Sequence, residues 1–361
     1  MNGSPRETGS DRVTHRARAS APVSPRWPLL AAGLILIAVV LVSASIGPAD
    51  LSIATVAGVL LSHVPLLHYH SSASPIDQAI VWQIRLPRVV LGGIVGSMLA
   101  AGGASYQGVF RNPLADPYLL GVAAGAGLGA TIVIVTNAGS TTLLPFAAFL
   151  GGATAVTMTY LVGARFGARS SGTSVVLAGV AVAALFTAVQ TFLQQQRSQD
   201  LQAVYSWILG SLSGATWSDV WLILPYVIVS AVVLLAHRRL LDVLRLGEEE
   251  ATSLGVNPQR VRLIVVAAAT LGTAAVVSVS GLIGFVGIIV PHLVRLTANA
   301  SYRVVLPVSM VAGASFIILA DLVAHSIESP AEVPLGVITA FIGGPFFIFV
   351  LRSRRANQGV L

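Results

Sequence analysis

Arg85 and Arg88 stand three residues apart in the segment WQIRLPR, directly before a long apolar run. On a helix this spacing places both side chains on one face. Two neighbouring guanidinium groups can bind carboxylates of an external partner through charge-assisted hydrogen bonds. The alternative is that both side chains only reach from an apolar helix towards water, as long basic side chains do. The pair is therefore a candidate dock for an acidic surface.

The segment LGEEEATSLGV (246–256) predicts a short helix that contacts a partner. Glutamates fill its first turn, where the helix dipole favours negative charge. A glycine stands where a C-cap belongs, and Pro258 prevents the helix from continuing. A short surface helix with an apolar stripe suits a groove in another protein, whereas an ordinary solvated connector is the alternative. The candidate contact residues are Leu246, Gly247, Glu248, Glu249, Glu250, Ala251, Leu254 and Gly255, with Leu246, Ala251 and Leu254 as the stripe.

Several kinds of chemistry are excluded by the residue types that the chain lacks. It has no Cys, so thiolate metal sites and Cys nucleophiles are ruled out. All 21 of its Lys and Arg residues are Arg. A P-loop needs Lys to reach the nucleotide phosphates, so the chain is not itself a P-loop ATPase. With no constellation of catalytic side chains in the sequence, we expect neither enzymatic activity nor a cofactor.

Two further sets of titratable residues are candidates for a metal site or for an ion relay. His63, His68 and His70 lie in the loop 62–76, but no carboxylate accompanies them at ligand spacing, so we interpret them as solvated residues rather than a metal site. Asp321 is the one carboxylate deep in an apolar run. Carriers driven by ion gradients usually need several buried carboxylates or histidines as relays. Their scarcity argues against such a carrier, which stays the alternative, and indicates that energy arrives from another chain.

The elements that position these residues are predicted to be membrane helices. The chain of 361 residues is 55% hydrophobic and 10% charged, with a mean hydropathy of +0.83, so lipid is its main solvent. We expect an all-α protein with about ten transmembrane helices. The predicted spans are 28–47, 88–109, 116–136, 142–164, 173–193, 219–237, 261–279, 281–296, 304–324 and 335–351, and the segment 201–214 is too short to cross and is expected to be re-entrant or interfacial.

The distribution of arginine predicts the orientation in the membrane. With the N-terminus inside, 18 arginines fall in inner loops and tails, and only Arg85, Arg88 and Arg197 fall outside. This bias follows the positive-inside rule and favours both termini in the cytoplasm. It also accounts for the net charge of +7, so the excess of basic residues does not have to indicate binding to nucleic acid. We expect a disordered cytoplasmic tail over 1–26, a permease domain over 27–352 with a cytoplasmic coupling segment at 240–258, and a cytoplasmic tail over 353–361.

Two proline motifs are predicted to end helices. In FRNPLADP, Pro113 and Pro117 break helical structure, while the side chains of Asn112 and Asp116 can cap neighbouring helix ends. The segment PHLVRL, with Pro291, His292 and Arg295, is expected to end the short eighth span in a similar way.

Taken together, the motifs resemble the FecCD family of permeases, the membrane subunits of type II ABC importers for iron–siderophore complexes, haem and vitamin B12. The resemblance covers about Trp82 to Leu351 and rests on ordered motifs. These are WQIRLPR (82–88), NPLADPYLLGVAAGAGLGA (112–130), LGEEEATSLGV (246–256), GLIGFVGIIVPHLVRL (281–296) and EVPLGVITAFIGGPFF (332–347).

The resemblance implies two permease subunits around a central pathway in the cytoplasmic membrane, two ATPase subunits inside and a substrate-binding protein outside. It implies that 246–256 transmits ATPase closure, and that Arg85 and Arg88 meet glutamates of the binding protein. A third basic docking position, Arg in the B12 permeases, falls at His325. The expected mechanism is alternating access, with the chelate left open.

Overall fold

The computed structural model describes residues 26–49, 51–64, 71–136, 143–166, 172–328 and 331–358. Every regular element in these ranges is a helix, which confirms the predicted fold class. The tail predicted to be disordered lies outside the described residues except for Arg26, the first residue of α1.

Ten helices occupy the ranges predicted to span the membrane. They are α1 (Arg26–Ser45), α4 (Leu86–Val109), α5 (Val122–Val135), α6 (Leu143–Phe166), α7 (Gly172–Gln196), α9 (Trp217–Leu244), α11 (Pro258–Ser280), α12 (Val286–Thr297), α13 (Tyr302–Ser326) and α14 (Leu335–Gln358). Seven of the helices in the described ranges are long and apolar enough to cross a membrane. The apolar parts of α5, α12 and α14 are shorter, so ten crossings and the cytoplasmic placement of both termini stay predictions.

Shorter elements connect these helices. They are α2 (Ile53–Ser62), α3 (Pro75–Ala79), the π-helix η1 (Ile80–Arg85), the 3₁₀-helices η2 (Pro117–Leu120) and η3 (Ser198–Asp200), α8 (Leu201–Ile208) and α10 (Glu248–Ser253). α2 lies outside the predicted spans. The predicted start of the second span is too late, because α3, η1 and α4 form one continuous helix from Pro75 to Val109.

The continuous helix runs through the centre of the bundle, and glycines let its neighbours approach it. A Cβ at Gly96 would collide with the Gly313 carbonyl of α13, and a Cβ at Gly103 with the Gly287 carbonyl of α12. Backbones in contact at small residues are the usual way for membrane helices to gain van der Waals packing without a hydrophobic driving force. Ser97 adds a hydrogen bond of 2.8 Å from its hydroxyl to the Met310 carbonyl of α13.

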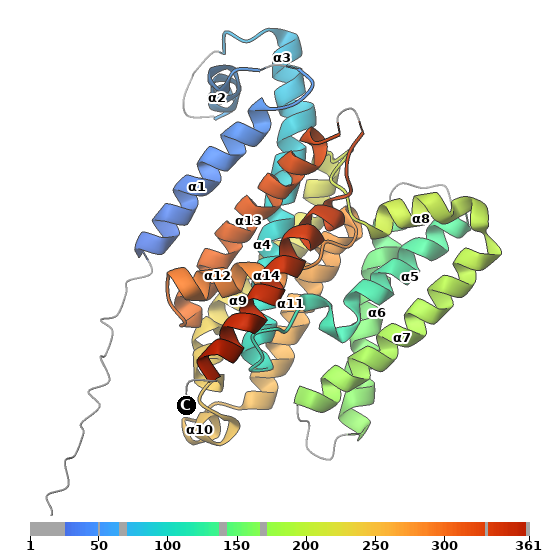
Figure 1. Ribbon diagram of the computed structural model, residues 1–361, viewed down its shortest axis with the longest axis vertical. Coiled ribbons are helices and arrows are strands. Elements are labelled where there is room, and N and C mark those ends of the chain that lie inside the picture. Colours follow the sequence, from blue (N-terminus) through green and yellow to red (C-terminus); the bar gives the residue numbers. More distant parts are fainter. Residues whose placement is uncertain are drawn as a thin grey trace, which may run out of the picture.

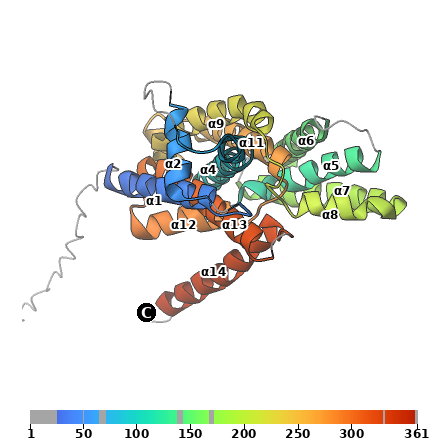
Figure 2. The same cartoon turned by 90° about the horizontal axis from the view of Figure 1, so that it is seen from above.

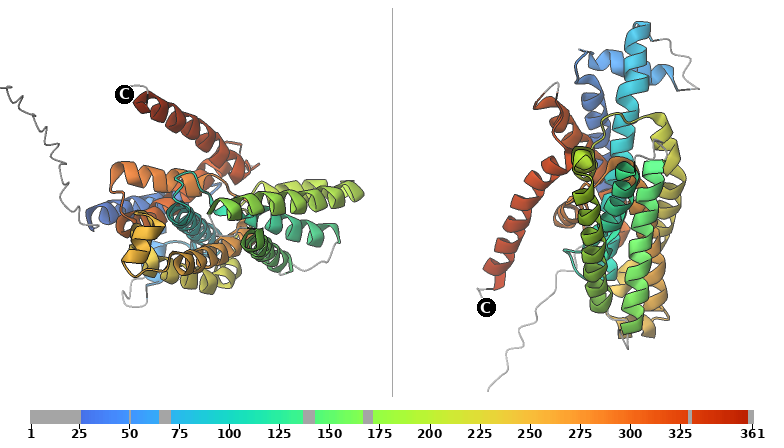
Figure 3. Two further views of the ribbon diagram at one scale, coloured as in Figure 1. Left: turned by 90° about the horizontal axis from the view of Figure 1, so that it is seen from below. Right: turned by 90° about the vertical axis from the view of Figure 1, so that its right-hand side faces the viewer.

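The molecule has two distinct ends and one projecting helix. Figure 1 places α2 and α3 at one end and α10 at the opposite end. From above, α14 stands away from the rest of the bundle (Figure 2), and the two views in Figure 3 agree. Phe341, Ile342, Ile348 and Phe349 on this helix are exposed.

Candidate functional sites at the two ends

Arg85 and Arg88 lie where the central helix changes its winding. Ser74 caps the start of α3, and its hydroxyl accepts a hydrogen bond of 3.1 Å from the Asp77 amide. The helix then widens into η1, and the Leu86 amide donates to the Val81 carbonyl, five residues back. Pro87 follows and has no amide hydrogen to donate. Wide turns of this kind are frequent at functional sites, and this one carries Arg85.

Arg85 binds the end of α1 rather than facing outwards. Its guanidinium donates to the carbonyls of Ala44 at 2.8 Å and Ser45 at 2.7 Å, and also to that of Ala49. A cation at a helix C-terminus satisfies carbonyls that have no partner within the helix. The side chain is buried among these carbonyls in this structure. Its role in docking stays a prediction.

Arg88 is held between two carboxylates distant in sequence. Its Nε and one terminal nitrogen donate to Asp321 of α13 at 2.8 and 2.9 Å. Its two terminal nitrogens donate to Glu332 at 2.7 and 2.9 Å. Both edges of the guanidinium are thus engaged in the paired geometry that suits Arg and carboxylate. The Asp321 side chain is 5% exposed and that of Glu332 is 33% exposed.

His325 lies beside the same ion pairs. Its Nδ1 is 3.8 Å from an Asp321 oxygen, which is too far for a hydrogen bond. Arg85, Arg88, Asp321, His325 and Glu332 all line one pocket of about 340 Å³ between the end of α1 and α13. The structure therefore brings the three sequence-predicted docking residues together. It adds Glu332, which the sequence analysis quoted only within the EVPLG motif.

The predicted histidine loop is only partly described. The ring of His63 stacks on that of Trp82, with centroids 3.7 Å apart. Trp82 also accepts, through its carbonyl, a hydrogen bond of 2.9 Å from the Trp217 indole. His68 and His70 lie outside the described residues. Within those residues, no group of three or more His, Cys, Asp or Glu side chains is placed to hold a metal ion.

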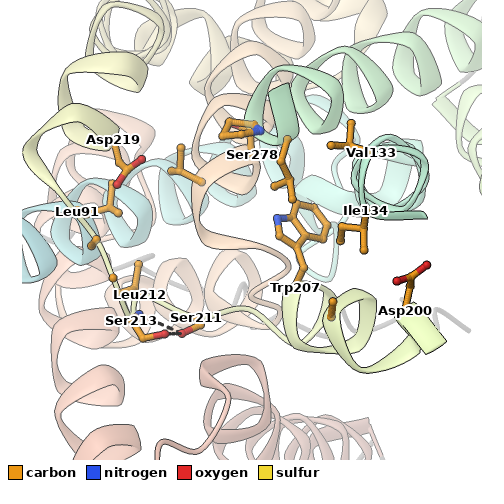
Figure 4. A pocket seen from close by; sticks show the side chains of 16 residues that line it. Leu91, Val133, Ile134, Asp200, Trp207, Ser211, Leu212, Ser213, Asp219 and Ser278 are labelled. Atoms are coloured by element: carbon orange, nitrogen blue, oxygen red, sulfur yellow. Dashed lines mark hydrogen bonds between the residues drawn. The ribbon is translucent and has the colours of Figure 1, made fainter. Parts of the chain in front are cut away.

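A second pocket, of about 570 Å³, lies among α5, α6, α8 and the start of α9. Figure 4 shows Trp207 of α8 beside Val133 and Ile134 of α5, with Asp200 on one side. Ser211 and Ser213 share a hydrogen bond of 2.8 Å on its wall. The lining mixes an aromatic and aliphatic surface with a few polar groups, which is the usual composition of a small-molecule pocket.

At the opposite end, α10 is followed by the glycine that the sequence predicted at its C-terminal end. Gly247 precedes the helix with φ of 138°, and Gly255 follows it with φ of 78°. Both values favour glycine. Asn257 then caps α11, whose first residue is Pro258. The helix is therefore bounded as expected, with Glu248, Glu249 and Glu250 in its first turn.

The apolar stripe on α10 differs from the prediction. Leu246 and Leu254 are each 62% exposed, but Ala251 is fully buried in the protein's own core. A helix of six residues has too few turns for its inner face to be read from spacing, and the smallest of the three side chains faces inwards. Arg262 of α11 donates to Glu248 at 2.6 Å, which ties the start of α10 to the next helix.

The NPLADP turn is built by its two polar side chains. The Asn112 side-chain oxygen accepts from the Leu114 amide at 3.0 Å, which forms a local turn rather than the expected helix cap. The Asp116 carboxylate accepts from the Tyr118 amide at 2.8 Å and caps η2, whose first residue is Pro117. Pro113 lies between them, after α4 has ended at Val109.

The PHLVRL segment forms the last turns of its helix, and its proline does not break it. Pro291, His292 and Arg295 all lie inside α12, which continues to Thr297. Pro291 has no amide hydrogen to offer the Gly287 carbonyl four residues back. Gln107 of α4 donates its side-chain amide to that carbonyl at 2.9 Å. The proline thus leaves an acceptor that a neighbouring helix uses, and the helix ends at Thr297, one residue after the predicted span.

Gln107 also accepts a hydrogen bond from Arg295. An Arg295 terminal nitrogen donates to the Gln107 side-chain oxygen at 2.5 Å, and the other approaches the Tyr302 hydroxyl at 3.3 Å. Asp242, near the end of α9, accepts from the Ser301 hydroxyl at 2.6 Å and the Tyr302 amide at 2.8 Å. These contacts join α4, α9, α12 and α13 near α10. Gln107 was not among the predicted site residues. Its one signal in the sequence is that a long polar side chain stands in a run of small and apolar residues.

Comparison with known proteins agrees with this architecture. The model of the FecCD transport family matches residues 35–353. The cobalamin import system permease protein BtuC of Halobacterium salinarum is 41% identical, over 91% of this chain and 96% of its own. The hemin transport system permease protein HmuU of Yersinia pestis is 36% identical, over 93% and 99%.

A solved structure extends the agreement to three dimensions. It is described as an inward-facing conformation of an ABC transporter of the metal-chelate type, and it superposes with a TM-score of 0.79. The sequences are 30% identical, and the match covers 90% of this chain and 98% of that one. The chain therefore belongs to the FecCD transport family, as a permease subunit of an ABC importer and a multi-pass protein of the cytoplasmic membrane.

Proposed function

We propose that this permease moves an iron chelate, haem or cobalamin inwards by alternating access. The observation that carries the proposal is the pairing of two unlike ends, an arginine cluster beside α1 and α13 and an exposed short helix, α10, opposite. Such ends suit two different partners. Relatives that import cobalamin and hemin support a large chelate as cargo, and the pocket beside Trp207 is a mixed surface along which it can enter.

At the inner end, α10 is proposed to contact a separate ATPase subunit, which hydrolyses the ATP. Leu246 and Leu254 are exposed apolar side chains on a charged segment, and exposed leucines beside acidic residues suit a groove on a partner. Glu249 is one of three exposed acids between them. Gly247, Gly255 and the Glu248–Arg262 pair hold the segment in place.

At the outer end, Arg85, Arg88 and His325 are proposed to receive a substrate-binding protein. Arg85 and Arg88 carry the positive charge that acidic groups on such a protein require. A second permease subunit, identical or paralogous, is proposed to cover the exposed face of α14, where Phe341 and Phe349 project. The full assembly then has two permeases, two ATPases and one binding protein in the lipid bilayer.

Reconstituted uptake tests the proposal. Proteoliposomes containing the permease, its ATPase and the binding protein should accumulate cargo only when ATP is supplied. Cobalamin, haem and ferric siderophores, offered separately to the purified binding protein, should identify the cargo. Uptake driven by a proton or sodium gradient without ATP would contradict the proposal and favour a secondary carrier.

A further inference from the structure

The docking arginine Arg88 is already occupied by carboxylates of its own chain. Of the five N–H groups of a guanidinium, Arg88 uses one on Nε and three on its terminal nitrogens to reach Asp321 and Glu332. Both paired edges are taken. An external carboxylate can therefore bind in the favoured paired geometry only where one of the internal carboxylates leaves.

The two internal carboxylates differ in how easily they can leave. Asp321 belongs to α13, its side chain is 5% exposed, and it also faces His325. Removing its cation would leave a buried charge unpaired, which is costly. Glu332 lies in the connection between α13 and α14, and its side chain is 33% exposed. Water can solvate the Glu332 carboxylate once it is released, so Glu332 is the exchangeable partner.

We propose that Glu332 is an internal competitor of the binding protein for Arg88. Docking exchanges one carboxylate for another, as an acidic side chain of the binding protein replaces Glu332 while Asp321 stays bound. This inference rests on the proposed docking role of Arg88 and adds the residue that opposes it. The occupant is thus a carboxylate on the surface of the extracytoplasmic binding protein.

The residues that follow Glu332 are hydrogen-bonded to other parts of the same end of the molecule. Next to Glu332, the Val333 amide donates to the Ala324 carbonyl of α13 at 3.1 Å. The amides of Leu335 and Gly336 donate to the carbonyls of Gly210 and Leu209, just after α8, both at 2.9 Å. Glu332 therefore lies in a connection that is hydrogen-bonded to α13 through Val333 and that leads into the start of α14, which is hydrogen-bonded to the residues after α8.

The test measures binding of the purified, substrate-free binding protein to the complete transporter in lipid nanodiscs. Glu332→Gln should tighten binding by about two- to fivefold, since partly exposed ion pairs contribute modestly. Glu332→Asp keeps the charge but shortens the side chain, and it should also tighten binding. Glu328→Gln is the matched control, because Glu328 is an exposed carboxylate on the same connection, and it should leave affinity unchanged.

Combining variants separates this inference from the docking proposal. Arg88→Ala should weaken binding, and Glu332→Gln should have no further effect in the Arg88→Ala background. If Arg88→Ala weakens binding but neither Glu332 variant tightens it, the competitor role is wrong while docking at Arg88 stands. If Arg88→Ala leaves binding unchanged, docking at Arg88 is itself wrong. Size-exclusion profiles and unfolding temperatures identify any variant that fails to fold.

Discussion

The two ends of the molecule present charge in opposite ways. At the outer end, Arg85 and Arg88 are satisfied by carbonyls and carboxylates of the same chain. At the inner end, α10 exposes two leucines and an acidic first turn. A partner outside must therefore replace contacts that already exist, whereas a partner inside only has to remove water from exposed groups. Reversible docking outside and lasting attachment inside are what these two arrangements favour.

The largest effect should come from reversing the charge of Arg88. Arg88→Glu places a third carboxylate beside Asp321 and Glu332 and leaves Asp321 buried without a cation. We expect a loss of about 3–5 kcal/mol in stability, together with loss of docking, measured by thermal unfolding and binding-protein affinity. Arg197→Glu, at an exposed arginine predicted to lie outside, is the control. If Arg88→Glu unfolds at the wild-type temperature, the ion pairs of Arg88 with Asp321 and Glu332 do not stabilise the protein, and the contrast between the two ends is wrong.

A smaller loss is expected from Gln107→Leu at the inner end. This change removes the donor to the Gly287 carbonyl and the acceptor for Arg295. Hydrogen bonds involving a charged group contribute about 1.5–3 kcal/mol, so the unfolding temperature should fall clearly. Gln195→Leu, at an exposed position of α7, should leave the temperature unchanged. An equal effect of the two substitutions would show that the Gln107 contacts are not stabilising.

Substitution of the exposed groups on α10 should change coupling and not stability. Leu254→Asp, and separately Glu249→Ala, should reduce ATP-driven uptake by about tenfold, because a partner contact worth about 1.4 kcal/mol is lost. The unfolding temperature should stay at the wild-type value. Ser253→Ala on the same helix provides the control. Wild-type ratios of transport to ATP hydrolysis in both variants would contradict the contact assignment.

The smallest effect is expected from Glu248→Gln. The Glu248 side chain is 47% exposed, whereas that of its partner Arg262 is 9% exposed. Gln keeps a side-chain oxygen that can accept from Arg262, so only the charge of a half-exposed group is lost and the cost should be about 1 kcal/mol or less. Unfolding temperatures of Glu248→Gln and of Glu332→Gln, compared side by side, sharpen the contrast between the ends. A loss in Glu248→Gln as large as in Arg88→Glu would mean that the inner end is also held by essential ion pairs.

Local sequence predicted most of the helices but only part of each site. Gly255 and Pro258 bounded α10 correctly, because caps act within one turn. The spacing of Arg85 and Arg88 placed them on one helix. Their partners, however, come from the end of α1 and from Asp321 and Glu332, which lie more than two hundred residues from Arg88. Such pairings depend on how helices pack, which hydropathy does not encode.

The errors have the same physical origin. Nothing in WQIRLPR indicates that Arg85 binds the carbonyls at the end of α1. Pro291 does not break α12, and Gln107 supplies a donor for the carbonyl that the proline leaves free. The burial of Ala251 likewise depends on the tertiary packing of a six-residue helix. In each case a distant part of the chain overrides a local rule.

The contacts along the central helix limit how it can move relative to its neighbours. From its outer to its inner end, this helix is joined to α13 by Arg88–Asp321 and by Ser97–Met310, and to α12 by Gln107–Gly287. Helices fastened at successive depths cannot bend independently, so α4, α12 and α13 should turn as one rigid body. A small rotation imposed at one surface would then reappear at the other with little loss.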